Sequence, residues 1–596
     1  MMTEPTPRFF AIIASFLLAA CAGYAALVLY AASWAEIRAL DQIFPFYNWH
    51  ITSLTAAELT AARQELAIGS LLLAGLLARM ALPAAGRHEL RYLGQEIGRA
   101  GTGLRRALRE LSHRQRNQAG ALLALLTVVR VYFSFANPEY DDAVSYEVFV
   151  SKGLLATSAY YPIPNNHVLS NTISLLFYQL NPGFWWSMRL PVLLISSAAT
   201  VLLFAGVVRR SNFRVALAAV GLFSGLQLSL YHAAVGRGYW LLILLAVVVF
   251  FSALELDRAR GRHRAAWAGL ALAGVLGCYT VPPFVYVLAS AFSWLGLGVL
   301  RRRQWPRLGL LAGVGFTIGA GAVLLYAPLL LVSGLSVFVG NGYVAPLAPG
   351  AFWTGLAGYL WHNEGFLAGQ RTLGSLVALP VLALLGWLFH LSRTRQLDEH
   401  RAHQLRDLGV PALWFMAFPY AVVIVQRVFP PERVMLYKAA FFFILAGLVI
   451  DWALARWSAR EWRWLRPALV TLAVLFGTYE TYSVIRVNPG ARGTNAAYHE
   501  GLRWLASQPA GPVLVPEPTH NLFFRFYAHS QVRERTWQID NDQRPGTRYS
   551  YVVAFPGKRG FFQPLFTFPP AYHNGEVEIY RVPKNYQLNT KSWRHD

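Results

Sequence analysis

Apolar stretches long enough to cross a lipid bilayer recur along almost the entire chain. A helix needs about 20 mainly apolar residues to span a hydrocarbon core of about 30 Å. Lipid offers no hydrogen-bonding partners, so such stretches fold as transmembrane α-helices. We count about thirteen of them, near residues 9–30, 66–86, 119–136, 188–208, 214–232, 239–256, 266–281, 284–300, 308–332, 373–391, 409–427, 434–454 and 467–485. The sequence therefore predicts a polytopic α-helical membrane protein.

The composition agrees with this prediction and argues against a nucleic-acid-binding protein. Hydrophobic residues make up 55% of the chain and charged residues only 14%, whereas about 25% of the residues in soluble domains are charged. The formal charge of +23 comes from basic residues that punctuate the apolar stretches instead of forming one surface. Cys21 and Cys278 both lie within apolar stretches, so we predict no disulfide framework and no zinc site on them.

The arginines predict which side of the membrane each loop occupies. The loop at 87–117 contains eight arginines and three glutamates, and positive residues in short loops stay in the cytoplasm. The loops that begin at 209, 257, 301, 392 and 455 are also rich in arginine and fall on the same side. We therefore expect a bacterial inner-membrane protein with a cytoplasmic N-terminus. The opposite, extracytoplasmic side receives the loops at 137–187, 333–372 and 430–433 and everything beyond 486.

Three regions follow from this topology. Residues 1–118 hold two transmembrane helices and a basic cytoplasmic loop, and residues 119–486 form a transmembrane core with its first extracytoplasmic loop at 137–187. In residues 487–596 the strand-like runs "GPVLVPE", "RYSYVVAF" and "EVEIYRV" are separated by turn residues. This composition predicts a small α/β domain, periplasmic or extracellular. The chain has no internal repeat, so a transporter built from inverted repeats receives no support.

An acidic segment, "NPEYDDAVSYE" at 137–147, begins the first extracytoplasmic loop. Asn137 and Pro138 suit the N-cap and first position of a helix, where each acidic residue gains about 0.3 to 1 kcal/mol from the helix dipole. Helix capping would thus explain Asp141 and Asp142 without any function. The same loop, however, continues with "YYPIPNNHVLSN", which contains Asn166 and His167. On these residues alone, capping and a functional site stay equally open.

Three arginines on the extracytoplasmic side favour a functional site. Arg189 lies in "SMRLP", Arg237 in "HAAVGRGYW" and Arg433 in "FPPERVMLY". Such arginines often only anchor a helix at the interface, but the positive-inside bias disfavours them on this face. The planar guanidinium group of arginine can bind one phosphate through two hydrogen bonds. The three arginines are therefore candidates for an anion-binding site.

Acids opposite phosphate-binding cations are what sugar transfer from a lipid phosphate requires. The attacking hydroxyl needs a base, whereas the departing phosphate needs only charge stabilisation. One carboxylate is sufficient for this, unlike glycoside hydrolysis, which uses two.

The order of these motifs resembles that in the GT-C membrane glycosyltransferases, especially the protein O-mannosyltransferase and lipid A aminoarabinose transferase group. The resemblance rests on "YDDAVSYE", "PNNHVL", "RLPVLLISSAATVLL", "HAAVGRGYWLL" and "PPERVMLY" and covers roughly residues 119–455. It implies a GT-C-like fold and a polyprenyl-phosphate-linked sugar as donor. The sugar would pass, with inversion by an aspartate base, to an extracytoplasmic glycan, lipid or protein hydroxyl.

The resemblance also assigns residues. The first extracytoplasmic loop of the family carries an Asp-Glu pair whose aspartate is the proposed base, which implies Asp141 as the base here and Asp142 as its neighbour. An Arg-x-Tyr element of the family is similar to Arg237-Gly238-Tyr239. A late arginine that usually precedes Tyr is similar to Arg433, which Val434 follows in this chain. We expect donor phosphate or substrate contacts from Arg189, Arg237, Tyr239, Arg433, Asn166 and His167.

One departure from the family concerns a metal ion. Aminoarabinose transferases have Glu-Lys-Pro-Pro where this chain has Asn166-His167-Val168-Leu169, so the acidic residue suspected of holding a metal is missing. His167 with an aspartate could bind a divalent ion, but a single loop histidine more often donates or accepts hydrogen bonds. No cofactor is predicted, and the need for a divalent metal stays open.

Two other functions compete with sugar transfer to a simple acceptor. A flippase or other transporter would also have many spans and intramembrane arginines, but its site is expected near the membrane midplane. A lipid-linked oligosaccharide ligase or polymerase would rely on Arg and His in a large late loop, for which "WHNEGFLAGQR" at 361–371 is the candidate.

Overall fold

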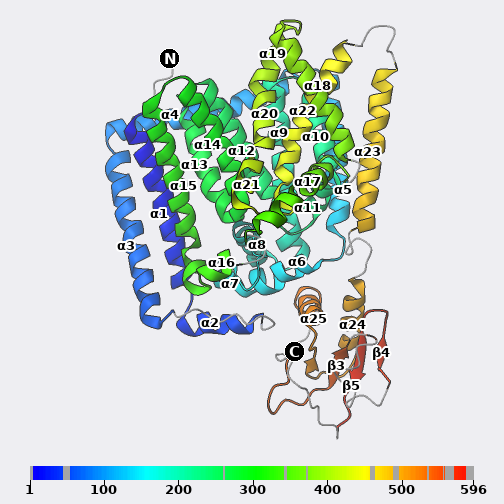
Figure 1. Ribbon diagram of the computed structural model, residues 1–596. Helices are drawn as coiled ribbons and strands as arrows, with labels where there is room; N and C mark the ends of the chain where they lie inside the picture. Colours follow the sequence, from blue (N-terminus) through cyan, green and yellow to red (C-terminus); the bar gives the residue numbers. More distant parts are fainter. Residues whose placement is uncertain are drawn as a thin grey trace.

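The computed structural model describes residues 5–44, 54–259, 262–340, 345–370, 374–456, 464–487, 495–532, 536–554, 556 and 569–584. Long helices dominate it and run roughly side by side, with a small sheet domain at one end (Figure 1). Ten helical segments are long and apolar enough to cross a membrane, and a bent pair of helices would make an eleventh. The chain is therefore an integral membrane protein.

Every predicted span overlaps one α-helix or two consecutive α-helices, while the number of membrane crossings stays a prediction. The helices are α1 (Pro7–Tyr30), α3 (Ala56–Ala81), α5 (His113–Ser134), α9 (Leu190–Arg210), α10 (Phe213–Gly225), α11 (Gln227–Ala234), α12 (Tyr239–Arg258), α13 (Arg264–Thr280), α14 (Val285–Arg301), α15 (Trp305–Val332), α18 (Gly374–Arg393), α20 (Val410–Ala417), α21 (Pro419–Gln426), α22 (Leu436–Arg456) and α23 (Leu465–Val487). Shorter helices in the connections are α2 (Trp34–Ala39), α16 (Leu335–Val339), α17 (Pro349–Leu367) and α19 (Glu399–Gln404).

The predicted span at 214–232 is broken into α10 and α11, which meet at 65°. A break frees backbone groups that lipid cannot satisfy. The backbone N–H of Gln227 donates to the Glu480 side chain of α23 at 2.6 Å, and Glu480 is buried. This carboxylate therefore replaces the partner that Gln227 lacks at the break.

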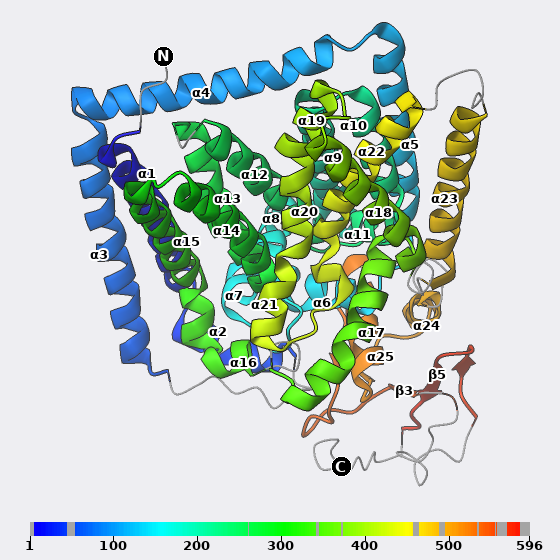
Figure 2. The same ribbon diagram turned by 45° about the horizontal axis from the view of Figure 1, so that its top comes forward.

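The predicted basic cytoplasmic loop is largely a helix, α4 (Ala84–Arg109), which lies across one end of the bundle (Figure 2). Glu89 and Glu96 are two turns apart and both are buried. They contact Arg264 at the start of α13, with N–O distances of 2.5 and 3.6 Å. The acids of α4 thus dock the helix onto the bundle, whereas Arg91 and Arg105 are among the arginines that remain exposed.

The loop predicted to be the first extracytoplasmic one forms short helices at the other end of the bundle. They are α6 (Tyr140–Val144), α7 (Gly153–Ala159) and α8 (Val168–Leu180), and one π-helical turn over Ser145–Phe149 follows α6 directly. Helix α1 contacts one of these short helices, α7, because the Tyr24 hydroxyl lies 2.8 Å from the Ser158 hydroxyl. The N-terminal helix therefore packs against the loop that carries the acidic segment.

The C-terminal domain combines two helices with one mixed sheet. Helices α24 (Ala496–Ala506) and α25 (Pro518–Ser530) accompany strands β1 (Val513–Leu514), β2 (Ile539–Asp540), β3 (Tyr551–Ala554), β4 (Tyr572–His573) and β5 (Glu578–Arg581). The strand order is β2-β1-β3-β5-β4, with β1 parallel to both of its neighbours and the remaining pairs antiparallel. All three predicted strand-like runs are strands. The predicted boundary at 487 adjoins residues 488–494, which lie outside the described residues.

The predicted orientation can be tested by labelling cysteines on intact cells with a membrane-impermeant thiol reagent. Ser112 precedes α5 at the arginine-rich end and Ser507 follows α24, and both residues are exposed. In a background without Cys21 and Cys278, we expect Ser507→Cys to react and Ser112→Cys to react only after permeabilisation. The reverse pattern would place every candidate site residue in the cytoplasm.

Candidate active site

Asp142 and Arg189 form a buried ion pair at the centre of the candidate site. The Arg189 guanidinium lies 2.6 Å from Oδ2 of Asp142, and neither side chain is more than 2% exposed. The other oxygen, Oδ1, accepts the backbone N–H of Gly236 at 2.9 Å. Burial raises the pKa of Asp142, and the charge of Arg189 opposes that rise. Both oxygens of Asp142 are therefore already engaged by protein donors.

The helix that carries the acidic pair begins later than the sequence predicted. The N-cap is Glu139 and the first helical residue is Tyr140, so the prediction of Asn137 as N-cap and Pro138 as first residue was wrong. The backbone N–H of Glu139 donates to Oδ2 of Asp142 at 3.4 Å. Asp142, the third residue of the helix, thus forms a capping box with the N-cap residue Glu139.

Asp141 has a different environment from its neighbour. Its side chain is 44% exposed, and Oδ2 lies 3.6 Å from the Arg237 guanidinium. Successive residues on a helix point about 100° apart, and here that separation directs Asp142 into the protein and Asp141 toward the open side. Solvent therefore reaches the carboxylate of Asp141 and not that of Asp142.

Arg237 is buried and connects several parts of the site. Its Nη1 donates to the backbone oxygen of Asn165 at 2.9 Å and also contacts the Asn165 side-chain oxygen. Its Nη2 lies 3.1 Å from Nε2 of His167. Asn165 therefore holds one side of the guanidinium, while the Nη2 side faces both His167 and Asp141.

His167 cannot accept hydrogen bonds at both ring nitrogens. Its Nδ1 accepts the backbone N–H of Gly238 at 3.0 Å, and a neutral imidazole has only one acceptor nitrogen. Burial, together with the charges of Arg237 and Arg433, holds the pKa of His167 well below its usual range. The ring is therefore neutral at pH 7, with its proton on Nε2 toward Arg237. Nη2 of Arg237 consequently keeps donor capacity for an anion.

Arg433 and Tyr239 complete the cluster that the sequence predicted. Arg433 is half-buried in a short 3₁₀ turn, Glu432–Val434, before α22, and its charge acts on His167. The Tyr239 ring is buried, with its centre 4.7 Å from that of His167 and 4.3 Å from that of His232. His232 was not predicted, although it opens the quoted motif "HAAVGRGYW".

Two predicted substrate ligands are engaged by protein atoms. The amide of Asn166 donates to the backbone oxygens of Thr157 and Tyr160 at 2.8 and 3.1 Å, and its oxygen accepts from Asn171 at 2.9 Å. Asn166 thus stabilises the segment between α7 and α8 through these hydrogen bonds. Arg189 likewise has Asp142 as its partner, and its Nη1 contacts the backbone oxygen of Ala234.

Glu147, the last acid of the segment, connects the loop to the C-terminal domain. It is fully buried, and its two oxygens lie 2.8 Å from Arg525 and 2.6 Å from His529, both on α25, while Lys152 is 3.1 Å away. Burial alone would raise the pKa of Glu147, but Arg525 and the contact with His529 outweigh it and hold that pKa well below its usual range. Sequence reasoning gave no signal for this contact, because residues 147 and 525 are 378 positions apart.

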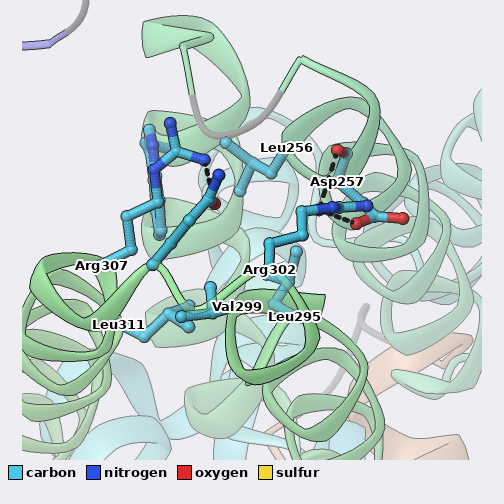
Figure 3. A pocket seen from close by; sticks show the side chains of 9 residues that line it. Leu256, Asp257, Leu295, Val299, Arg302, Arg307 and Leu311 are labelled. Carbon is cyan, nitrogen blue, oxygen red and sulfur yellow. Dashed lines mark hydrogen bonds and ion pairs between the residues drawn. The ribbon is translucent and has the colours of Figure 1, made fainter. Parts of the chain in front are cut away.

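No metal-binding arrangement occurs in the part of the chain that the structure describes: no three His, Cys, Asp or Glu side chains are grouped to hold an ion. Among these described residues, His167 is therefore not part of such a group. The small cavity in Figure 3 is also unrelated to this site. It measures about 20 Å³, room for one water molecule, and is lined by Asp257, Arg302 and Arg307 near the arginine-rich end of the bundle.

Comparison with known proteins identifies the fold. No protein-family model and no curated protein sequence matches the chain. Among solved structures, apo ArnT from Cupriavidus metallidurans is 13% identical, with a TM-score of 0.51 over 77% of this chain and 97% of ArnT. ArnT bound to undecaprenyl phosphate gives 14% identity and a TM-score of 0.49 over the same shares of the two chains. EmbB arabinosyltransferase from Mycobacterium smegmatis is 16% identical, with a TM-score of 0.37 over 66% of this chain and 34% of EmbB. The chain therefore has the fold of ArnT, as the GT-C-like fold implied by the sequence resemblance led us to expect.

Proposed function

We propose that this protein is a membrane glycosyltransferase that transfers a sugar from a polyprenyl-phosphate carrier to an acceptor hydroxyl on the extracytoplasmic side. The observation that carries the proposal is a half-exposed carboxylate, Asp141, 3.6 Å from the buried guanidinium of Arg237. It lies on the first loop of a GT-C fold. A base beside an anion-binding cation is the pair of groups that this reaction needs.

Asp141 is the base in this proposal. The acceptor oxygen attacks the anomeric carbon while its proton passes to Asp141. The bond from that carbon to the phosphate oxygen breaks, and polyprenyl phosphate leaves with the electron pair. One displacement inverts the anomeric centre. Asp142 keeps its place in the pair with Arg189, which holds the helix of Asp141 in position.

Arg237 and Arg433 stabilise the departing phosphate. Arg237 directs Nη2 toward Asp141, and the charge of Arg433 acts on the same His167 ring that Nη2 approaches. The hydrogen bond from Gly238 keeps that ring in the tautomer with Nδ1 as acceptor. Arg189 does not bind the donor phosphate in this proposal, because its charge is paired with Asp142. No step requires a metal ion.

Replacing Arg237 or Arg433 by Ala is expected to weaken donor binding. Removing one partner of a charged contact in a desolvated site costs about 2 to 5 kcal/mol, which corresponds to at least a tenfold loss of affinity. The measurement is the Kd of a polyprenyl-phosphate sugar. Arg486→Ala is the matched control, because Arg486 is an exposed arginine in the last turn of α23, the end next to the C-terminal domain. Equal affinity in all three variants would return Arg237 and Arg433 to the role of interface anchors.

The ligase or polymerase alternative depends on the segment at 361–371. His362 in this segment is exposed, and Arg371 lies outside the described residues. Glu364 is bound to Lys438 at 2.5 Å. This contact ties α17 to the start of α22.

The decisive test of the proposed function is turnover. Purified protein is incubated with a panel of polyprenyl-phosphate sugars and acceptor membranes, and the release of polyprenyl phosphate is measured. We expect one donor to be consumed. Movement of intact donor across the membrane without release of polyprenyl phosphate would instead support a flippase.

A further inference from the structure

An apolar groove lies far from the candidate active site, between α1, α13 and α15. It encloses about 270 Å³, and its walls include Phe10 and Ala14 of α1, Trp267 and Ala271 of α13, and Gly309 and Gly313 of α15. No acidic or basic side chain lines it. A groove of this composition on transmembrane helices accommodates hydrocarbon and not a polar substrate.

The groove lies in one leaflet of the bilayer. Helices α13, α14 and α15 follow one another as consecutive spans, so α13 and α15 begin at the same end of the bundle, where α1 also begins. The lining residues all fall within the first thirteen residues of their helices, which places them within about 20 Å of that end. The arginine distribution predicts this end to be cytoplasmic, opposite Asp141.

Two arginines lie close in sequence to residues that line the groove, and Nη1 of one of them, Arg307, also donates to the Gln304 side-chain oxygen at 2.6 Å. Arg8 directly precedes the lining residue Phe9 on α1 and is exposed, and Arg307 precedes the lining residue Gly309 on α15. Figure 3 shows Arg307 beside Leu311, next to the small cavity that shares Trp267 with the groove. Trp305, in the first turn of α15, is 62% exposed and is suited to the headgroup layer.

From this juxtaposition we infer that the groove is a binding site for an anionic glycerophospholipid of the cytoplasmic leaflet. One acyl chain occupies the apolar groove, and the phosphate lies between Arg8 and Arg307. The carrier of the proposed reaction is a different ligand, because its phosphate has to reach Arg237 at the other end of the bundle. This inference is independent of the proposed function.

Glycine substitutions on α15 offer a matched test. A Cβ added at Gly313 or at Gly319 would meet no atom within 4 Å, so Leu fits at either position without strain. Only Gly313 lines the groove. Leu also favours a helix more than Gly does, so we expect both variants to fold.

The readout is native mass spectrometry of the full-length protein after addition of dioleoyl phosphatidylglycerol or dioleoyl phosphatidylcholine. We expect Gly313→Leu to bind about tenfold less of either lipid, because Leu displaces several methylene groups of the chain. Gly319→Leu should bind as the wild type does. Equal binding by these two variants would overturn the inference.

A second pair of variants tests the headgroup. Arg8→Gln combined with Arg307→Gln should abolish the preference for phosphatidylglycerol over phosphatidylcholine, whereas Arg301→Gln, at an exposed arginine on α14, should keep it. A wild-type protein without that preference would contradict the assignment of an anionic lipid. If the molecule displaced by Gly313→Leu is polyprenyl phosphate, the groove belongs to the carrier and the inference is wrong.

Discussion

Asp141→Asn is expected to lower turnover by about 10² to 10⁴-fold, the usual contribution of a general base, while donor binding is kept. Asparagine preserves the size of the side chain and its contact with Arg237 but cannot take the acceptor's proton. Since Asp141 is half-exposed and lies as far as 3.6 Å from the Arg237 guanidinium, we expect the variant to fold normally. Steady-state turnover and donor Kd, measured on the same preparation, separate the two effects.

Asp142→Asn is the contrasting variant, because it alters stability first. It leaves Arg189 buried without its counter-charge, and breaking a buried ion pair in this way costs about 3 to 5 kcal/mol. Thermal unfolding should shift clearly, while each folded molecule loses less turnover than in Asp141→Asn. Near-normal turnover in Asp141→Asn together with collapse in a stable Asp142→Asn protein would show that the base is Asp142. Full activity in both would leave helix capping as their only role.

The sequence was most informative where structure depends on neighbouring residues. Apolar length alone predicted the helices, since each span satisfies its backbone within itself. The resemblance picked out Arg237 and Tyr239, which the fold then brings beside His167. The helix α4 was read as a loop, although Glu89 and Glu96 lie two turns apart on one face and could have revealed it.

Contacts between distant residues were beyond sequence reasoning. Arg189 was expected to contact the donor because the positive-inside bias disfavours an arginine at its predicted position, yet Asp142, 47 residues away, is its partner. Successive residues on a helix point about 100° apart, so the side chains of Asp141 and Asp142 must point in different directions. Which of the two is buried depends on the contacts of Asp142 with Arg189 and Gly236. The break at Gln227 likewise depends on Glu480, on another helix.

Glu147→Gln is expected to weaken docking of the C-terminal domain on the membrane core. The Glu147 carboxylate is the shared partner of Arg525, His529 and Lys152, and the loss of one member of a buried pair costs about 3 to 5 kcal/mol. Other contacts also join the domain to the core. Phe526 packs on Tyr146 with ring centres 5.4 Å apart, and Asn495 donates to the backbone oxygen of Pro138 at 2.8 Å.

Hydrogen exchange measures this docking directly, because amides of α25 should lose protection while those of α22 keep it. Glu500→Gln is the control, since Glu500 is an exposed acid of the same domain. Acid should reproduce the effect in the wild type. The undocked carboxyl has an ordinary pKa near 4.5 and the docked one a lower pKa, so docking is fully stabilised above about pH 5 and weakens progressively as the pH falls further. Glu147→Gln should lack this acid dependence, and an α25 equally protected in both proteins at pH 7 would reduce Glu147 to a minor contact.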